Sequence, residues 1–186
     1  MDVRLQPFGQ EVKAYADTIT LSSNSRYAFD YNNDAANGPV YGKLYTALSA
    51  LNTDLYTGII QGICPNGWHV PSDQEWLTME IFAGMSTSVA NQMIAYRDTI
   101  AYKFKTVGTD FWITAKGTDE LEFSAKGCGA YYDQIGWGFY FLKDRGTWWT
   151  YGFDNLMYRQ LTDFQAGIWR GATIPNAAVS VRCIMD

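Results

Sequence analysis

The sequence lacks the residues from which several common kinds of site are built. It has one histidine among 186 residues and no C-x-x-C pair, which excludes a His-rich metal site and a zinc ribbon. Lysine and arginine total 14 against 19 acidic residues, without a basic run, so nucleic acid is not an expected partner. No apolar run approaches the roughly 18 residues that a membrane-spanning helix needs, so membrane insertion is not expected.

Charge is also scarce, at 18% of residues, whereas hydrophobic residues make up 47%. This balance excludes a disordered chain and a coiled coil. A length of 186 residues is enough for one domain with a real core, and we treat residues 1–186 as a single domain. The first residues, Met1 to Arg4, lead into polar sequence, so we expect no signal peptide in this chain.

Aromatic residues, in contrast, are abundant, with 7 Trp, 13 Tyr and 10 Phe. Part of this content must form a core. Tyr and Trp in loop-like sequence are also typical of recognition surfaces, because large rigid side chains bind at a low entropy cost. At this point two interpretations are open: these Tyr and Trp residues form a recognition surface, or they fill a second core.

The three cysteines Cys64, Cys128 and Cys183 allow one disulfide at most. As a nucleophile Cys128 would need a nearby base. The only histidine, His69, lies beside Trp68 in a segment that we interpret as a structural corner. We therefore expect Cys128 to be a free thiol without a catalytic role.

This corner, residues 63–76, contains a helix start with several reinforcing signals. Ser72 is placed to cap the helix, and Glu75 three residues later completes a capping box. Asp73 and Glu75 also put negative charge at the positive end of the helix dipole, so this carboxylate pair needs no catalytic explanation. Two tryptophans bracket the start and are expected to be buried: Trp68 and Trp76.

Hydrophobic spacing predicts helices first and antiparallel strands afterwards. The helices are expected at residues 41–51, 73–82 and 88–96. The strands are expected at residues 19–21, 121–125, 137–142, 146–150, 157–161 and 179–185. Turn-forming residues make the first forty residues irregular. The fold class is therefore α+β, with two or three helices packed on short antiparallel strands and with long loops.

Five motifs, in the right order, resemble those of the Fibrobacter succinogenes major paralogous domain. They are Y-G-K-L-Y at 41–45, I-C-P-N-G-W-H-V-P-S-D-Q-E-W at 63–76, F-S-A at 123–125, G-T-W-W-T at 146–150 and S-V-R-C at 180–183. The resemblance covers residues 41–186. This family consists mostly of secreted or surface modules of Bacteroidetes and Fibrobacteres, and it is similar to C-type lectin-like domains.

The resemblance implies a C-type lectin-like domain whose N- and C-terminal strands lie close together, with a loop-rich binding face. It also implies a disulfide between Cys64 and Cys183 and an extracellular or cell-surface location, with a phage particle as the alternative. The chain departs from the family pattern at residues 126–132, 151–155 and 178–179. These departures lie in the expected binding loops and leave the ligand open.

We expect the ligand to contact the segments 131–139, 151–155 and 163–170. The candidate ligand-binding residues are Tyr131, Tyr132, Gln134, Trp137, Phe139, Tyr151, Phe153, Asp154, Asn155, Asp163, Gln165, Trp169 and Arg170. Tyr and Trp would supply flat apolar faces, and the polar members would supply specificity. No cofactor is expected. The calcium-lectin motifs E-P-N and Q-P-D are absent, although a structural calcium ion remains compatible with the polar loops.

The expected function is therefore non-enzymatic recognition of a protein or a glycan on a cell surface, as in an adhesin. The alternative is a variable receptor-binding protein of a diversity-generating retroelement, which a phage could encode. An enzyme of the formylglycine-generating type is less well supported, because only Cys128 and Cys183 lie in the distal region and Cys183 already has a structural role. The oligomeric state is left open.

Overall fold

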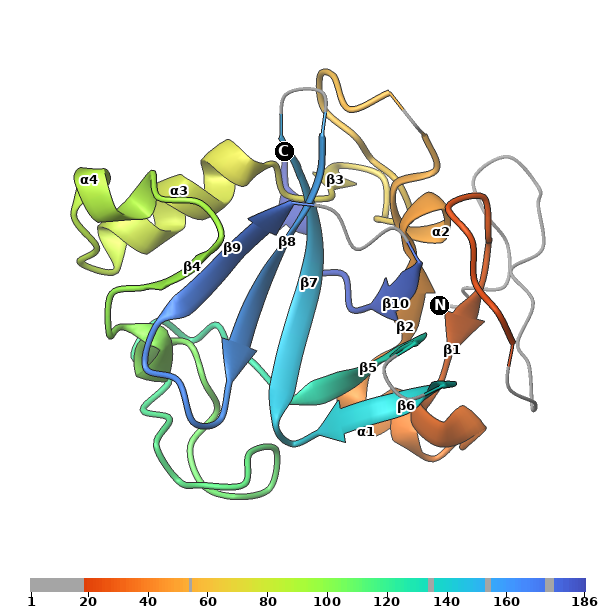
Figure 1. The fold of residues 1–186 in the computed structure, drawn as a ribbon. Coiled ribbons are helices and arrows are strands. Elements are labelled where there is room, and N and C mark those ends of the chain that lie inside the picture. The colour runs from red at the N-terminus through yellow and green to blue at the C-terminus, as the bar shows by residue number, and fades with distance from the viewer. Residues whose placement is uncertain (1–18, 54, 134–135, 153–154, 173–175) are drawn as a thin grey trace.

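Two antiparallel β-sheets and a few short helices make up the fold (Figure 1). The computed structural model describes residues 19–53, 55–133, 136–152, 155–172 and 176–186. The observed class is thus a mixed one with mostly antiparallel sheets, which agrees with the α+β prediction. In these described ranges no helix has both the length and the apolar character needed to cross a membrane.

Five strands form the first sheet, in the order β1-β2-β10-β5-β6, and each neighbouring pair is antiparallel. Their bounds are β1 Ala28–Phe29, β2 Leu44–Thr46, β10 Ala177–Val179, β5 Cys128–Asp133 and β6 Trp137–Leu142. Strand β10, which comes late in the chain, therefore lies at the centre of the sheet. Early and late strands meet here, as the family resemblance implies.

Four strands form the second sheet, in the order β4-β9-β8-β7, again all antiparallel. Their bounds are β4 Ala95–Arg97, β9 Ile168–Ala172, β8 Asn155–Thr162 and β7 Arg145–Gly152. In Figure 1 this sheet stands between helices α3 and α4 on one side and the five-stranded sheet on the other. A separate small pair joins β3 Trp68–His69 to β11 Ile184–Met185.

Helix α3, Asp73–Phe82, confirms the helix predicted at residues 73–82. The Ser72 hydroxyl accepts a bond from the Glu75 N–H at 3.3 Å, and the Glu75 carboxylate accepts one from the Ser72 N–H at 2.7 Å. The predicted capping box is therefore present. Because both partners lie within four residues of each other, local sequence was enough to predict it.

Two other predicted helices are wrong in extent. Across residues 41–51, α1 (Asn37–Tyr41) ends before Gly42, which has a φ of 80°, and only α2 (Ala47–Leu51) is helical afterwards. The residues between them form β2, because they pair with β1 on one side and β10 on the other.

Across residues 88–96 the chain forms a short helix α4, Thr87–Ala90, and then strand β4. The described residues also form two 3₁₀ turns, at Tyr31–Asn33 and Ala101–Lys103.

The strands predicted at 137–142, 146–150 and 157–161 are confirmed as β6 and as parts of β7 and β8. Those at 19–21 and 121–125 are wrong. In the second case Asp119 holds a turn, accepting bonds from the Ser124 N–H and hydroxyl at 2.7 Å. The strand predicted at 179–185 is interrupted, because Ser180 leaves the sheet to exchange backbone hydrogen bonds with Thr147 and Trp149 of β7.

Three hydrophobic clusters form the core, and aromatic side chains dominate them. Trp149 is fully buried in the first cluster, Trp76 and Trp112 are buried in the second under α3, and Tyr131 is buried in the third. Trp76 is thus buried as predicted. Trp68 is not, because it is 40% exposed on the two-stranded pair, where no further layer covers it.

The cysteines take structural positions. The Sγ atoms of Cys64 and Cys183 are bonded at 2.04 Å, which ties the corner before α3 to the segment between β10 and β11. Cys128 is free and buried on β5, and its thiol donates to the Tyr41 carbonyl at 3.1 Å. Burial raises the pKa of this thiol to about 11, so it is protonated at neutral pH and lacks the nucleophilic thiolate form.

Candidate functional site

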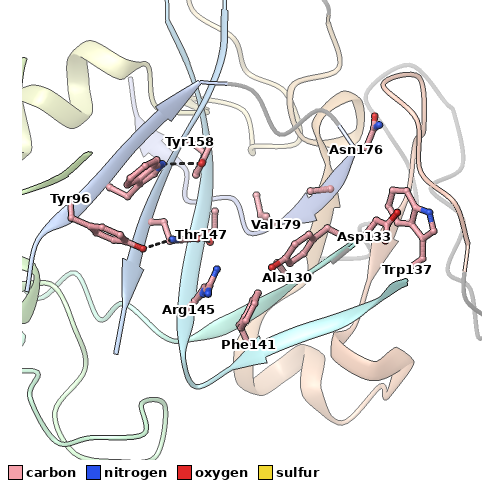
Figure 2. Close-up of a pocket in the computed structure, with 14 residues that line it drawn as sticks. Tyr96, Ala130, Asp133, Trp137, Phe141, Arg145, Thr147, Tyr158, Asn176 and Val179 are labelled. Atoms are coloured by element: carbon pink, nitrogen blue, oxygen red, sulfur yellow. Dashed lines mark hydrogen bonds between the residues drawn. The ribbon is translucent and has the colours of Figure 1, made fainter. Parts of the chain in front are cut away.

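A cavity of about 590 Å³ lies between the two main sheets (Figure 2). Its lining comes from seven strands and one adjoining loop residue, so most of its wall is built on regular structure. The lining residues are Tyr96, Ala130, Tyr132, Asp133, Trp137, Phe141, Arg145, Thr147, Tyr158, Gln160, Trp169, Asn176, Ala177 and Val179. Strand alternation explains most of this spacing, since every second side chain points to the same face, and Asp133, directly after Tyr132 at the end of β5, is the exception.

The four-stranded sheet contributes an aromatic wall made of Tyr96, Tyr158 and Trp169. Tyr96 and Trp169 are direct cross-strand partners on β4 and β9, with ring centroids 5.1 Å apart. The Trp169 indole N–H donates to the Tyr158 hydroxyl at 2.9 Å. Burial raises the pKa of Tyr158, so its hydroxyl stays protonated well beyond neutral pH. The wall therefore presents flat, half-buried rings held by strand register.

A polar chain runs along the same wall. The Thr147 hydroxyl donates to the Gln160 amide oxygen at 3.3 Å, and the Gln160 amide nitrogen donates to the Tyr96 hydroxyl at 2.8 Å. Thr147 and Gln160 face each other across β7 and β8. Figure 2 shows this chain and the Tyr158 contact as dashed lines on one side of the cavity.

Arg145, at the start of β7, supplies positive charge to the cavity. Its guanidinium carbon lies 3.5 Å from the centre of the Phe141 ring, a cation–π contact, and its Nε is 3.6 Å from an Asp144 oxygen. That Nε is buried and has no hydrogen-bond partner among the residues that the structure describes. Burial raises the pKa of Asp144, and Arg145 partly offsets this effect. Tyr132 stacks on the other side of Phe141, with centroids 5.8 Å apart.

Asp133 and Trp137 mark the far end of the cavity from Tyr96 (Figure 2). They face each other as partners on β5 and β6. An Asp133 oxygen accepts a bond from the Gly136 N–H at 3.1 Å, which holds the turn between these strands. Asp133 is solvent-exposed, so its charge is screened. The cavity thus has an aromatic wall at one end, an arginine in its lining and an exposed carboxylate at the other end.

Three of the predicted ligand-binding residues line this cavity: Tyr132, Trp137 and Trp169. Three predicted aromatic residues instead belong to the core. Tyr131 is 1% exposed, and its hydroxyl donates to the Ile19 carbonyl. Tyr151 is 5% exposed, and its hydroxyl donates to the Gly58 carbonyl. Phe139 packs against the buried ring of Tyr31. Internal partners hold these three side chains and none of them lines the cavity, so their contact with a ligand stays a prediction that this cavity does not support.

Two predicted specificity residues, Asp163 and Arg170, are also structural. Asp163 is buried and accepts bonds from the Thr114 N–H and hydroxyl. Arg170 is buried and forms a two-bond ion pair with Asp73, with its Nε 3.0 Å and its Nη2 2.5 Å from the two carboxylate oxygens. Burial raises the pKa of Asp73, but bonds from Arg170 and Arg159 lower it further, so the net pKa is below its usual range.

The remaining predicted residues line no part of the cavity that the structure describes. Asn155 and Gln165 are exposed, at the start of β8 and after its end. Gln134, Phe153 and Asp154 lie outside the described residues.

The other eleven lining residues were not among the predicted ligand-binding residues, and they include Tyr96, Phe141, Arg145, Tyr158 and Gln160. Two of them carried a usable signal. Tyr158 and Gln160 alternate within the strand predicted at 157–161, so they share one face. Tyr96 was hidden by the wrong helix at 88–96. Nothing local indicated that β4 and β6 border the same cavity.

In the corner before α3, the only histidine of the chain contacts two carboxylates. His69 is buried, with one ring nitrogen 2.8 Å from a Glu75 oxygen and the other 2.6 Å from an Asp186 oxygen. Burial lowers the pKa of His69, but these two carboxylates offset that effect, and the net pKa is raised. Across the described ranges, no group of three or more His, Cys, Asp and Glu residues could hold a metal ion.

Comparison with known proteins identifies the family. The model of the Fibrobacter succinogenes major domain matches residues 4–185, which is nearly the whole chain and begins well before residue 41, where the motifs start. No curated protein and no solved structure matches the sequence or the fold. The chain therefore belongs to the Fibrobacter succinogenes major domain family.

Proposed function

We propose that this protein is a non-enzymatic recognition module that binds its ligand in the cavity between the two sheets. The observation that carries this proposal is the aromatic wall of Tyr96, Tyr158 and Trp169 facing a cavity of about 590 Å³. Ligand sites in proteins are commonly about 300–1,000 Å³, mostly apolar, with a few placed polar groups. The cavity has this size and this composition.

Sugar rings suit such a wall. The faces of Trp and Tyr pack against the apolar C–H face of a ring, and their polar atoms bond to its edge. Strand pairing fixes Tyr96 against Trp169, so little side-chain freedom is left to lose on binding. A glycan on a cell surface is therefore the ligand that we place first, ahead of a protein segment.

The finer fold assignment, a C-type lectin-like domain, is also part of the proposal. It is supported by the meeting of β1 and β2 with β10 in one sheet, and by the long excursion that builds the second sheet between them. An extracellular or surface location is supported by the Cys64–Cys183 disulfide, since disulfides persist in oxidising compartments.

A glycan array probed with wild-type protein and two tryptophan variants tests the proposed function. Trp169→Ala removes part of the aromatic wall, and we expect it to reduce binding about tenfold or more, as loss of a central aromatic contact does. Trp68→Ala is the matched control, because Trp68 is exposed and lies outside the cavity. Equal binding by Trp169→Ala and wild type, with both folded by circular dichroism, would place recognition elsewhere.

A further inference from the structure

The hydroxyl of Tyr158 has a proton to donate. An indole N–H can only donate, so the Tyr158 oxygen is the acceptor in its bond from Trp169. Among the described residues no acceptor takes the proton of the Tyr158 hydroxyl. The wall of the cavity therefore offers one free O–H donor at this position.

The polar chain along the wall leaves a second free donor. As drawn, the Tyr96 oxygen accepts from the Gln160 amide, which leaves the Tyr96 proton unused. With the Gln160 amide turned over, Tyr96 would donate to it, and the amide would donate to Thr147. The free proton would then belong to the Thr147 hydroxyl. In either orientation this chain ends in a hydroxyl that can donate into the cavity.

Arg145 adds further donors together with a positive charge. The stack of its guanidinium on Phe141 occupies one face of the group and leaves the N–H edge available. Its Nε is 3.6 Å from the Asp144 carboxylate, beyond an ordinary hydrogen bond, and is buried without another partner among the described residues. The Nε is enclosed by protein, but the Arg145 side chain as a whole is 29% exposed and lines the cavity, so a ligand acceptor would meet its terminal N–H groups.

The cavity thus offers hydroxyl and guanidinium donors, and its charged lining residues are Arg145 and the exposed Asp133. A neutral sugar would fit the aromatic wall but bring no negative charge to Arg145, whose nearest carboxylate, Asp144, is 3.6 Å from its Nε. A dianionic phosphate would bring two negative charges to one arginine that already has Asp144 nearby. A carboxylate brings one charge and two planar oxygens, which match the guanidinium edge.

Building on the proposed function, we infer that the ligand is an acidic glycan and that Arg145 binds the carboxylate of one of its uronate residues. The ring of that residue packs on the wall of Tyr96, Tyr158 and Trp169. The free tyrosine hydroxyls donate to its ring and hydroxyl oxygens.

Calorimetric titration with an oligogalacturonide and with its fully methyl-esterified form tests this inference. Esterification removes the charge and keeps the sugar rings. Because charge-assisted hydrogen bonds are stronger than neutral ones, wild-type protein is expected to bind the acid at least about tenfold more tightly than the ester. Arg145→Gln should remove this preference, so that the variant binds the acid and the ester with similar affinity. Lys116→Gln, which removes the same charge at an exposed position away from the cavity, should keep it.

The comparison of acid and ester uses wild-type protein, so it does not depend on how the variants fold. Equal affinity for both forms, lost in Trp169→Ala, would overturn the inference and leave the proposed function standing. Absence of binding to either form would also overturn it, and the glycan array would then decide the proposed function separately. A preference for the acid that survives Arg145→Gln would exclude Arg145 as its cause.

Discussion

At the scale of single residues, the buried ionisable groups set the pH behaviour of this fold. Lys105 is 3% exposed, and its ammonium donates to the Thr162 carbonyl at 2.6 Å and lies 5.0 Å from the Trp112 ring. Burial lowers its pKa to about 8, an effect that nearby Asp163 partly offsets. Above pH 8 the native state therefore loses this proton while the unfolded state, with an ordinary lysine pKa of 10.5, still holds it.

We expect Lys105 to contribute a rise of about 2 kcal/mol in the free energy of unfolding between about pH 8 and about pH 10, because the unfolded lysine then binds more protons. The raised pKa of Cys128, at about 11, acts against this rise over the same range, so the Lys105 contribution is the difference between wild type and a Lys105 variant. Above that range the raised pKa of tyrosines such as Tyr45, at about 12, makes the free energy of unfolding fall as the pH rises. Urea unfolding across this range measures the rise, and Lys105→Met should abolish it. Lys143→Met, at a half-buried position, is the control that should retain it.

His69 predicts a change of the opposite sign at lower pH. Its pKa is raised in the native state, so its contribution is complete below the unfolded pKa of 6.5 and is lost as the pH rises through the native value. We therefore expect wild-type protein to be more stable at about pH 5.5 than at about pH 7.5, below the range in which Lys105 titrates. His69→Gln should be less sensitive to this change in urea unfolding. The same sensitivity in both proteins would assign the effect to another group.

Residue identity alone was a poor guide to the site. Asp163 and Arg170 have the polar side chains of specificity residues, but partners far along the chain occupy them, Thr114 and Asp73. Nothing in the neighbouring sequence indicates such long-range pairing. Trp169, in contrast, which was predicted to contact the ligand, lines the cavity, where its polar N–H suits a position at the edge of a core rather than inside it.

At the scale of elements, one carboxylate joins α3 to the four-stranded sheet. Glu80 is fully buried and accepts bonds from Arg97 of β4 at 2.7 and 2.9 Å and from Arg159 of β8 at 2.8 Å. Both arginines are buried as well. Removing the carboxylate charge would leave the buried Arg97 without its carboxylate partner and Arg159 with Asp73 alone.

We expect Glu80→Gln to lower the free energy of unfolding by about 3–5 kcal/mol, the range found when a buried ion pair loses one partner. Glu120→Gln is the matched control. Its oxygen is 3.9 Å from the Lys103 ammonium and half-exposed, so its loss should cost less than about 1 kcal/mol. Urea unfolding of the two variants compares them directly, and similar losses would contradict a special role for the buried network.

Local signals also decided which elements could be predicted. Helix α3 was predicted correctly because its capping box lies in adjacent residues. Residues 41–51 have helical spacing, yet Leu44–Thr46 became β2 because β1 and β10 offer backbone partners there. In such short segments, backbone pairing with distant strands outweighs the local helix propensity. Antiparallel strands were expected, but their division into two sheets and the choice of strands that border the cavity depend on long-range order that spacing cannot give.

At the scale of the whole molecule, the Cys64–Cys183 disulfide encloses most of the fold, because its two cysteines are 119 positions apart in the sequence. Loop-entropy arguments give such a link about 4–5 kcal/mol of stabilisation. We therefore expect a double variant, Cys64→Ser with Cys183→Ser, to melt about 10–20 °C below wild type in differential scanning calorimetry. A reducing agent should lower the melting temperature of wild type and leave that of the double variant unchanged. Cys128→Ala should keep the response to reduction.

The position of β10 has a consequence for how the protein is made. This strand, Ala177–Val179, fills the centre of the five-stranded sheet, between β2 and β5. A growing chain on the ribosome therefore holds β2 and β5 with open hydrogen-bonding edges until residue 179 has emerged. The first sheet cannot close during synthesis of the earlier residues, and its folding must wait until β10 has been made. Until then the nascent chain needs protection from pairing with other strands.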